Sequence, residues 1–356
     1  MKQKNKIIFV SLLVILTLST IFNTTYATDI TANENNQETN ENANTEELNL
    51  YAQSCLLVEK KSHKIIYAKN ADAKIYPAST TKILTALIAL EKCNLTDTVT
   101  ITSDMVYSIP SGYKLAYLPI GKTVTVEQLL NLLLIPSTND SGYALAIHIS
   151  GSIDNFAVLM NEKAAQLGCV NSHFTNPCGV HSENHYTTAT DMGIIALKAM
   201  ENETLTTICS TPSYEFNGKV FDTTNTLMKA DSNSFYEYVN GLKTGYTGPA
   251  GSCIIATASK EDMNYMALVF NAPEPTSSFN YRDADCKTLF EYAFENHYKL
   301  AVVEQQTTEF VTNFFSQSIQ FNNILKIGLS VLFVCCCTKS AISSKSSGKR
   351  KTKRKK

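Results

Sequence analysis

The sequence contains no Cys-x-x-Cys pair and no regular spacing of cysteines. Three of its ten cysteines, Cys335–Cys337, fall in an apolar run near the C-terminus. The remaining seven are an odd number, so at least one thiol stays free and no obligatory disulfide framework is predicted. The missing dithiol pair also argues against a zinc knuckle and against a redox-active dithiol. The seven are Cys55, Cys93, Cys169, Cys178, Cys209, Cys253 and Cys286.

Basic charge is scarce in the body of the chain. The formal net charge is −1, but residues 345–356 carry eight Lys and Arg without an acid, and the first six residues carry three Lys. Without these two ends the net charge is −12, because eleven positive charges are removed. An acidic body argues against nucleic acid as a partner, since phosphate binding needs a basic surface.

The N-terminal segment has the pattern of an export signal. Three lysines precede the apolar stretch Ile7–Leu18, and Thr25-Tyr26-Ala27 offers a small-x-small cleavage site. We therefore predict a cleaved signal peptide over residues 1–27, with a retained membrane helix as the weaker alternative. Residues 28–48 are rich in Asn, Glu and Thr and nearly free of apolar side chains, which predicts a disordered spacer.

The C-terminal segment lacks a long apolar run. Ile327–Cys337 is eleven residues long, short of the roughly 20 that a membrane helix needs. A membrane anchor over residues 320–338 would recruit polar neighbours, with Lys326 reaching outward, and would follow a short connector at 301–319. The basic tail, residues 339–356, is typical of a cytoplasmic end. An anchor lying in the membrane interface is the alternative.

Residues 49–300 have the pattern of one folded domain of the α+β class. Ser54–Glu59 and Lys64–Ala68 predict a β-hairpin, and Ser252–Ala258 and Tyr265–Phe270 predict another. Between them the pattern is helical, with helices expected at Val126–Leu134, Tyr143–Ile149, Phe156–Leu167 and Asp191–Met200, and Cys286–Phe294 should close the domain as a further helix. Strands at both ends of a helical block predict an antiparallel sheet flanked by helices, plus a mostly helical subdomain.

A first chemical motif lies at the start of an apolar helix. Ser79 and Lys82 precede the run Ile83–Leu90, whose apolar residues cover most of the helix circumference and predict burial. A spacing of three places the hydroxyl and the amine on one face of the helix, as a nucleophile and its base would require. Alone this motif is weak, because Ser-x-x-Lys also occurs at Ser111/Lys114 and at Ser346/Lys349.

Two further motifs strengthen the first. Ser137-Thr138-Asn139 follows the predicted helix Val126–Leu134, and Lys243-Thr244-Gly245 precedes the second hairpin on what should be an edge strand. An edge strand with a glycine allows an extended peptide to approach closely and pair with it. The three motifs follow one another at intervals of 58 and 106 residues, each in its own plausible context, so chance agreement is remote.

This set resembles the serine D-alanyl-D-alanine carboxypeptidases, which are the low-molecular-mass penicillin-binding proteins. The resemblance extends from about Ser54 to Phe294 and includes the segments 76–82, 174–179, 185–192 and 243–251, with Arg282 in the closing helix. It implies the penicillin-binding protein/β-lactamase-like transpeptidase fold and a cell-wall role. Two features depart from the family. The roughly twenty residues between Lys299 and the expected anchor cannot hold the β-rich second domain that the family often adds, and Thr138 stands where Gly or Ala is usual.

The resemblance implies a role for each site residue. Ser79 would be the nucleophile that forms an acyl-enzyme, Lys82 the general base, and Ser137 the relay of a proton to the leaving amine. Asn139 would hold the substrate's peptide amide, while Lys243 and Thr244 would bind its terminal carboxylate, with Arg282 as a further candidate. The backbone N–H groups of Ser79 and Tyr246 would form the oxyanion hole. Burial and the charge of Lys243 should lower the pKa of Lys82.

The implied substrate is the pentapeptide stem of peptidoglycan, from which the terminal D-alanine is removed, and β-lactams would be covalent inhibitors. No cofactor or metal is implied. The enzyme would be exported and held at the cell membrane, with its catalytic domain on the extracytoplasmic face.

Other classes of protein fit less well. His181 and His185 lie four apart, but Pro177 and Gly179 argue against a helix there, so a zinc site is disfavoured. No Gly-x-Ser-x-Gly elbow occurs, which disfavours a Ser-His-Asp hydrolase. A β-lactamase of class A would need a glutamate followed closely by Leu-Asn between the second and third motifs. None of the six glutamates in that interval is followed by this pattern. A non-catalytic penicillin-binding sensor or wall-binding protein of the same fold remains the alternative from a different class.

Overall fold

The computed structural model describes residues 48–302 of the chain. The chain divides into two units, Met1–Asn49 and Leu50–Lys356, and the second carries the fold described below. The predicted signal peptide, membrane anchor and basic tail lie outside the described residues, as do the spacer up to residue 47 and the connector from residue 303. Within the described part of the chain, no single helix is both long and apolar enough to cross a membrane.

Strands and helices alternate in blocks along the chain. The strands are β1 (Ser54–Glu59), β2 (Ile65–Lys69), β3 (Thr98–Thr100), β4 (Thr123–Thr125), β5 (Ser213–Phe216), β6 (Lys219–Asp222), β7 (Val239–Thr247), β8 (Gly251–Lys260) and β9 (Met263–Ala272). The α-helices are α2 (Lys82–Lys92), α3 (Ser103–Tyr107), α4 (Val126–Leu134), α5 (Asn139–Ser150), α6 (Ile153–Gln166), α7 (Ala189–Met200), α8 (Glu203–Ser210) and α9 (Tyr281–Val302). Short 3-10 turns are η2 (Ala78–Thr81), η3 (Thr226–Met228) and η4 (Gly248–Ala250).

The main sheet has five strands in the order β2-β1-β9-β8-β7, each antiparallel to its neighbour. The predicted hairpin of β8 and β9 brings Ile255 opposite Leu268, and β1 pairs on the far side of β9 with Leu56 opposite Leu268. The first strand of the domain therefore lies in the middle of the sheet beside one of the last. β7, which carries the third motif, lies at the sheet edge as predicted.

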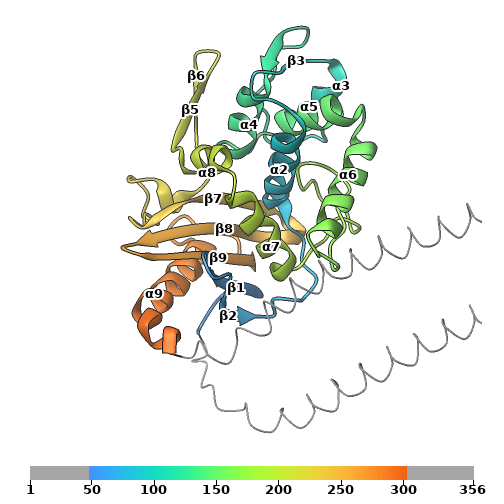
Figure 1. Cartoon of the computed structure of the whole chain (residues 1–356). Coiled ribbons are helices and arrows are strands. Elements are labelled where there is room, and N and C mark those ends of the chain that lie inside the picture. The colour runs from blue at the N-terminus through green and yellow to red at the C-terminus, as the bar shows by residue number, and fades with distance from the viewer. Residues whose placement is uncertain (1–47, 303–356) are drawn as a thin grey trace, which may run out of the picture. The chain divides into compact units, whose positions relative to one another are not determined.

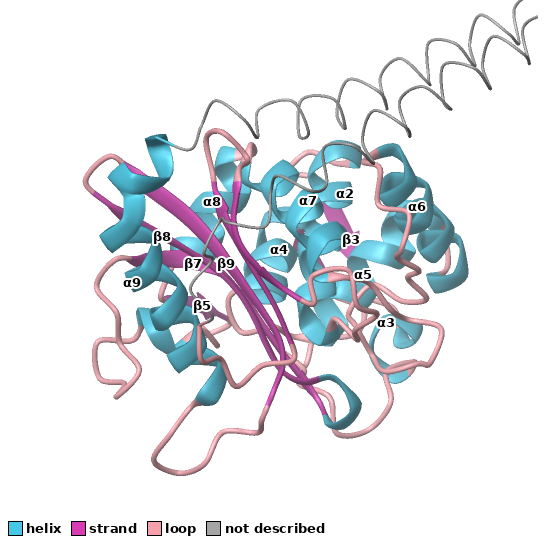
Figure 2. Cartoon of the chain, turned by 90° about the horizontal axis from the view of Figure 1, so that it is seen from below, coloured by secondary structure: helices cyan, strands magenta, loops and turns pink. Residues whose placement is uncertain are grey.

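Helices cover both faces of this sheet. α9 packs against β8 and β9 on one face, and α7 and α8 pack against β1, β9 and β7 on the other. Figure 1 shows α9 apart from the other helices, and Figure 2 shows the strands between α9 and the helical block. The predicted α+β class, with an antiparallel sheet and a helical subdomain, is confirmed.

Helix α2 is the centre of the helical block. It packs against α4, α5, α6 and α7, and residues 82–89 are all buried (Figure 1). Each fully buried Leu or Ile side chain of this helix contributes about 1.5–3 kcal/mol through the hydrophobic effect. The burial predicted for the Ser79–Lys82 helix is therefore confirmed, and it gives the first motif a rigid support.

Candidate active site

The nucleophile candidate lies in a tight turn and not within the helix proper. Ser79 belongs to η2, immediately before α2 begins at Lys82. Ala78 has a φ of 46°, a left-handed conformation that non-glycine residues seldom adopt. Gly179 packs on this turn so closely that an added Cβ would come within 1.7 Å of the Ala78 carbonyl oxygen. Only glycine fits at position 179, and its neighbours hold the turn in place.

The edge strand approaches the same turn from the other side. A Cβ added to Gly245 would lie 2.9 Å from the Ser79 backbone nitrogen and 3.1 Å from the Pro77 carbonyl oxygen. The glycine of the third motif therefore lets β7 lie directly against η2. Tyr246, whose N–H was predicted to form an oxyanion hole with that of Ser79, follows Gly245 directly and lines the same pocket as Ser79.

Lys82 makes three contacts that suit a neutral amine. Its Nζ lies 2.8 Å from the Ser79 Oγ, 2.9 Å from the Asn139 Oδ1 and 3.1 Å from the Cys178 carbonyl oxygen. The amide and carbonyl oxygens can only accept, and they use the two N–H bonds of a neutral amine. The lone pair is then left for the Ser79 hydroxyl proton. The geometry therefore suits Lys82 to act as a base toward Ser79.

The electrostatic surroundings favour this protonation state. Burial lowers the pKa of Lys82, with Cys178 and Asp140 opposing the shift. Burial and then the charge of Lys82 lower the pKa of Lys243 well below its usual value. The predicted effect of burial on the pKa of Lys82 is confirmed. The predicted effect of the Lys243 charge on Lys82 is not, because the repulsion between the two lysines lowers the pKa of Lys243 instead.

Asn139 is held in the orientation that Lys82 needs. Its Nδ2 donates to the Lys114 carbonyl oxygen at 3.0 Å, so its Oδ1 faces the amine. Its backbone N–H donates to the same carbonyl at 2.8 Å. Asn139 is the first residue of α5, whereas the sequence predicted that this helix begins at Tyr143. In this structure its side chain positions Lys82.

Asp140, the residue that follows Asn139, was not predicted from the sequence. Asp140 is fully buried, and its carboxylate accepts hydrogen bonds from the backbone N–H groups of Ala116 and Leu118 at 2.9 and 3.0 Å. Together Asn139 and Asp140 tie the 114–118 segment to the start of α5. The signal in the sequence was an acidic residue in the first turn of an otherwise apolar helix, which indicates a buried hydrogen-bond acceptor.

The remaining predicted side chains lie at different depths. Ser137 and Thr244 line the same pocket as Ser79. Ser137 has a φ of 66°, and no hydrogen bond joins its hydroxyl to Ser79 or Lys82 in the described part of the chain. Lys243 does not line the pocket; it is 1% exposed, and its Nζ donates to the Thr244 carbonyl oxygen at 2.9 Å. Lys243 is thus buried beneath the pocket surface, on the same side of β7 as Gly245.

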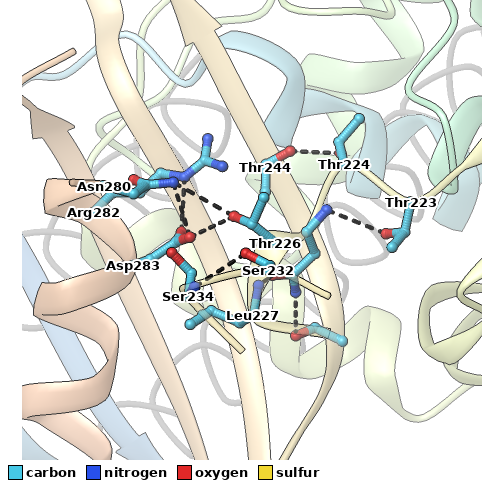
Figure 3. A network of polar contacts seen from close by, with 12 residues as sticks. Thr223, Thr224, Thr226, Leu227, Ser232, Ser234, Thr244, Asn280, Arg282 and Asp283 are labelled. Carbon is cyan, nitrogen blue, oxygen red and sulfur yellow. Dashed lines mark hydrogen bonds and ion pairs between the residues drawn. The ribbon is translucent and has the colours of Figure 1, made fainter. Parts of the chain in front are cut away.

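A polar network surrounds Thr244 and Arg282 (Figure 3). The Thr244 hydroxyl donates to the Thr224 Oγ1 at 2.6 Å, and both threonines line the pocket. The Arg282 Nε donates to the buried Asp283 carboxylate at 3.2 Å, which also accepts from Thr226 and Asn280. Because Nε is occupied, the terminal nitrogens of Arg282 are the ones left for a ligand in the pocket.

The two histidines of the alternative zinc motif have different surroundings. The backbone N–H of Thr175 donates to the His185 Nδ1 at 3.0 Å, so the other nitrogen, Nε2, carries the proton and donates to the Thr81 Oγ1 at 2.9 Å. Burial lowers the pKa of His185 to about 3. His185 is therefore a neutral link between the 174–185 segment and η2, whereas His181 lines the pocket.

The pocket has a volume of about 520 Å³ and holds most of the predicted site. Fifteen residues line it, among them Lys114 and Arg282 but no Asp or Glu. In the part of the chain that the structure covers, no group of His, Cys, Asp and Glu could hold a metal ion. The lining residues are Ser79, Gly112, Tyr113, Lys114, Ser137, Asn139, His181, Thr224, Thr244, Gly245, Tyr246, Thr247, Gly248, Pro249 and Arg282.

Comparisons with known proteins agree with this arrangement. Residues 38–274 match the family described as D-alanyl-D-alanine carboxypeptidase. The chain is 37% identical over 263 residues to the D-alanyl-D-alanine carboxypeptidase DacF of Bacillus subtilis, covering 71% of this chain and 64% of that protein. It is 31% identical over 254 residues to DacA of Escherichia coli, covering 68% of this chain and 60% of that protein. The chain therefore spans less than two thirds of the length of these relatives.

Solved structures are similar in the same region. The crystal structure of a Streptomyces DD-transpeptidase matches with a TM-score of 0.64 and 28% identity, covering 70% of this chain and 99% of that one. A D-alanyl-D-alanine carboxypeptidase from Mycobacterium tuberculosis matches with a TM-score of 0.62 and 27% identity, covering 70% of this chain and 92% of that one.

Proposed function

Because the chain belongs to the D-alanyl-D-alanine carboxypeptidase family, we propose that it is a serine-type carboxypeptidase that removes the terminal D-alanine from the pentapeptide stem of peptidoglycan. The observation that carries this proposal is the 2.8 Å contact between the Ser79 Oγ and the Nζ of the buried Lys82. A hydroxyl and a neutral amine at this distance are a nucleophile and its base.

In the proposed reaction the Ser79 oxygen attacks the carbonyl carbon of the penultimate D-alanine, and its proton moves to the Lys82 Nζ. The backbone N–H groups of Ser79 and Tyr246 stabilise the resulting oxyanion. Each such donor is typically worth roughly 2.7–4 kcal/mol in the transition state. The carbon–nitrogen bond then breaks, a proton reaches the leaving amine through Ser137, and D-alanine departs.

Water completes the cycle by attacking the acyl-enzyme. Lys82, neutral again after its proton has passed through Ser137 to the leaving amine, takes a proton from the water. It passes this proton to the Ser79 oxygen as the ester bond breaks, which releases the shortened peptide and restores the hydroxyl. Until D-alanine departs, its carboxylate is held by Thr244 and the terminal nitrogens of Arg282, with the buried Lys243 contributing charge. A bound carboxylate favours the protonated form of Lys243, which burial otherwise disfavours.

The same site should react with β-lactams and release them slowly. Acylation needs only Ser79 and Lys82, whereas class A β-lactamases use an added glutamate for rapid hydrolysis of the penicilloyl ester. No Asp or Glu is among the residues that line this pocket. We therefore infer that penicillin remains bound to Ser79 as a long-lived ester.

The decisive test combines two measurements on purified protein. D-Alanine release from a peptide ending in D-Ala-D-Ala should be catalytic, and mass spectrometry after brief exposure to penicillin should show a persistent adduct. The Ser79→Ala variant should lose both signals. Ser111→Ala, which changes the serine of the second Ser-x-x-Lys match, should keep both.

Other outcomes distinguish the alternatives. An adduct that clears within seconds, with penicillin destroyed in excess, would identify a β-lactamase. A stable adduct without D-alanine release would identify a penicillin-binding sensor or wall-binding protein.

Export and membrane attachment form part of the same proposal. They are supported by Lys2–Leu18, by the apolar run at 327–337 and by the basic tail. In cell fractionation the full chain should sediment with membranes, and a chain ending at Val302 should be soluble with its peptide activity retained. Recovery of the shortened chain in the membrane fraction would contradict the proposed anchor.

A further inference from the structure

Arg282 occupies a position that its own helix disfavours. It is the second residue of α9 and therefore lies in the first turn. The N-terminal end of a helix carries partial positive charge, which is unfavourable for a cation. Arg282 is also largely buried, at 9% exposed, although it lines the pocket. A cation that is buried at this end of a helix needs an anion beside it.

The next residue, Asp283, supplies that anion. Its side chain is 1% exposed, and its Oδ1 accepts a hydrogen bond from the Arg282 Nε at 3.2 Å. Because the contact uses the inner nitrogen of the guanidinium group, the two terminal nitrogens lie on the side away from Asp283 (Figure 3). The guanidinium group is a rigid planar fork of donors, so a fixed Nε also fixes the direction of the terminal nitrogens.

The second carboxylate oxygen of Asp283 is held just as firmly. Oδ2 accepts hydrogen bonds from the Thr226 hydroxyl and from the Asn280 Nδ2, the latter at 2.8 Å. The Asn280 Oδ1 is buried and has no hydrogen-bond partner in the part of the chain that the structure describes. An unpaired buried oxygen is unfavourable. The Asn280 amide is thus oriented to hold Asp283 in place, at the expense of its own oxygen.

The same carboxylate reaches the other half of the proposed carboxylate site. Thr226 begins η3, and two residues before it Thr224 lines the pocket and accepts a hydrogen bond from the Thr244 hydroxyl at 2.6 Å. Asp283 therefore contacts both Arg282 and the segment that supports Thr244. In the proposed reaction, Arg282 and Thr244 together hold the terminal carboxylate of the substrate.

We propose that Asp283 is a positioning residue that makes the site specific for a free C-terminal carboxylate, because it holds Arg282 and the Thr224–Thr226 segment in a fixed relation. The inference rests on the proposed function and deepens it by naming a determinant of its specificity. A carboxylate offers two acceptor oxygens to a fork of donors, whereas a carboxamide turns an N–H donor toward it. Fixed donors cannot move aside for that group, and they therefore reject the amide.

The test uses two peptides that end in D-Ala-D-Ala and differ only at the C-terminus, a carboxylate in one and a carboxamide in the other. With the full-length protein, kcat/KM for release of the last residue should favour the acid by about 100-fold, since hydrogen bonds to charged groups are lost with the amide. Asp283→Ala should lower this acid-to-amide ratio by about 10-fold or more. The loss should lie mainly in KM for the acid, because the carboxylate is bound before and during the reaction.

Asp285→Ala is the matched control. Asp285 lies two residues later in α9 and is also 1% exposed, but its carboxylate accepts from the backbone N–H groups of Tyr51 and Ala52 at 3.0 and 2.8 Å. It is not among the residues that line the pocket. Its loss should lower the melting temperature and keep the acid-to-amide ratio within about twofold of the wild type, since distant sites act independently.

A milder variant serves if Asp283→Ala does not fold. Thr226→Val removes one donor to the Asp283 carboxylate and keeps the shape of the side chain. It should lower the acid-to-amide ratio by about threefold, because one hydrogen bond of the network is lost. In that case an unchanged ratio in Thr226→Val would overturn the proposed role of Asp283.

The remaining outcomes separate this inference from the proposed function. A wild-type ratio in folded Asp283→Ala, or an equal loss of the ratio in Asp285→Ala, would overturn the positioning role and leave the proposed function intact. Equal rates for the two peptides in the wild-type protein would overturn the specificity that Asp283 is proposed to determine. Release of the last residue from neither peptide would overturn the proposed function and, with it, this inference.

Discussion

Gly245→Ala is expected to impair the reaction because it separates two parts of the site. The added Cβ would lie 2.9 Å from the Ser79 nitrogen, 3.1 Å from the Ala78 Cβ and 3.1 Å from the Pro77 carbonyl oxygen. Two of these three neighbours are backbone atoms of the nucleophile turn and cannot rotate away. Since ordinary contact begins near 3.4 Å, strand and turn must move apart by about 0.5 Å.

That displacement acts on the proposed oxyanion hole, whose donors come from the two separated elements. A misplacement of about 1 Å can cost roughly 10²-fold in rate, and complete loss of one oxyanion donor costs about 10²–10³-fold. We therefore expect acylation by penicillin to fall by about 10- to 100-fold. Stability should change little, because β7 is an edge strand with a neighbour in the sheet on one side only.

The assay is the second-order rate of adduct formation, followed by mass spectrometry, with the melting temperature measured in parallel. Gly248→Ala is the matched control, because a Cβ at that position meets no atom within 4 Å and its backbone is not left-handed. It should stay within about threefold of the wild type. An acylation rate for Gly245→Ala as high as that of the control would refute the proposed role of the β7–η2 contact.

Three further results are expected. The acylation rate should fall with decreasing pH as Lys82 becomes protonated, and because burial lowers the pKa of Lys82 the midpoint should lie below 10.5; a midpoint at or above 10.5 would contradict the buried base. Because the pKa of His185 is about 3 in the fold and 6.5 ordinarily, its stabilising effect is complete above pH 6.5 and lost as the pH falls toward 3, by up to roughly 1.4 kcal/mol per pH unit. Denaturant unfolding should therefore show the difference between wild type and His185→Gln narrowing over that range, and a constant difference would argue for a charged His185. Gly179→Ala should destabilise by several kcal/mol, since its Cβ would overlap the Ala78 carbonyl at a φ of 75°, and an unchanged melting temperature would contradict that packing.

The sequence predicted the bounds of a helix correctly where neighbouring residues determine its ends. α4 covers Val126–Leu134 as predicted, because Thr125 and Gln128 form a capping box at its start. The start of α5 was predicted at Tyr143 but lies at Asn139. The side chains of Asn139 and Asp140 form hydrogen bonds with Lys82 and with the 114–118 segment. These partners are distant in sequence, so the local pattern did not indicate that Asn139 and Asp140 belong to the helix.

In the candidate site, too, some features could be predicted from the motifs and others depend on residues outside them. The motifs predicted that Ser79, Lys82 and Asn139 would meet, and the structure brings them within hydrogen-bonding distance. The Cys178 carbonyl, which contacts Lys82, is a backbone group that any residue would supply. The depth of Lys243 follows from which side of β7 each side chain faces, and the motif alone does not specify it. The network of Thr224 and Thr226 lies outside every motif.

The burial of Lys82 links the stability of the fold to its chemistry. No salt bridge within residues 48–302 includes Lys82 or Lys243, and the more distant Asp140 only partly offsets the burial of Lys82. An unpaired ammonium group in a protein interior costs several kcal/mol unless it loses its proton. Burial of Lys82 therefore shifts its proton equilibrium toward the neutral amine that a base requires. Because the contacts of Lys82 come from η2, α5 and the 174–180 segment, the neutral base exists only where all three segments are in place.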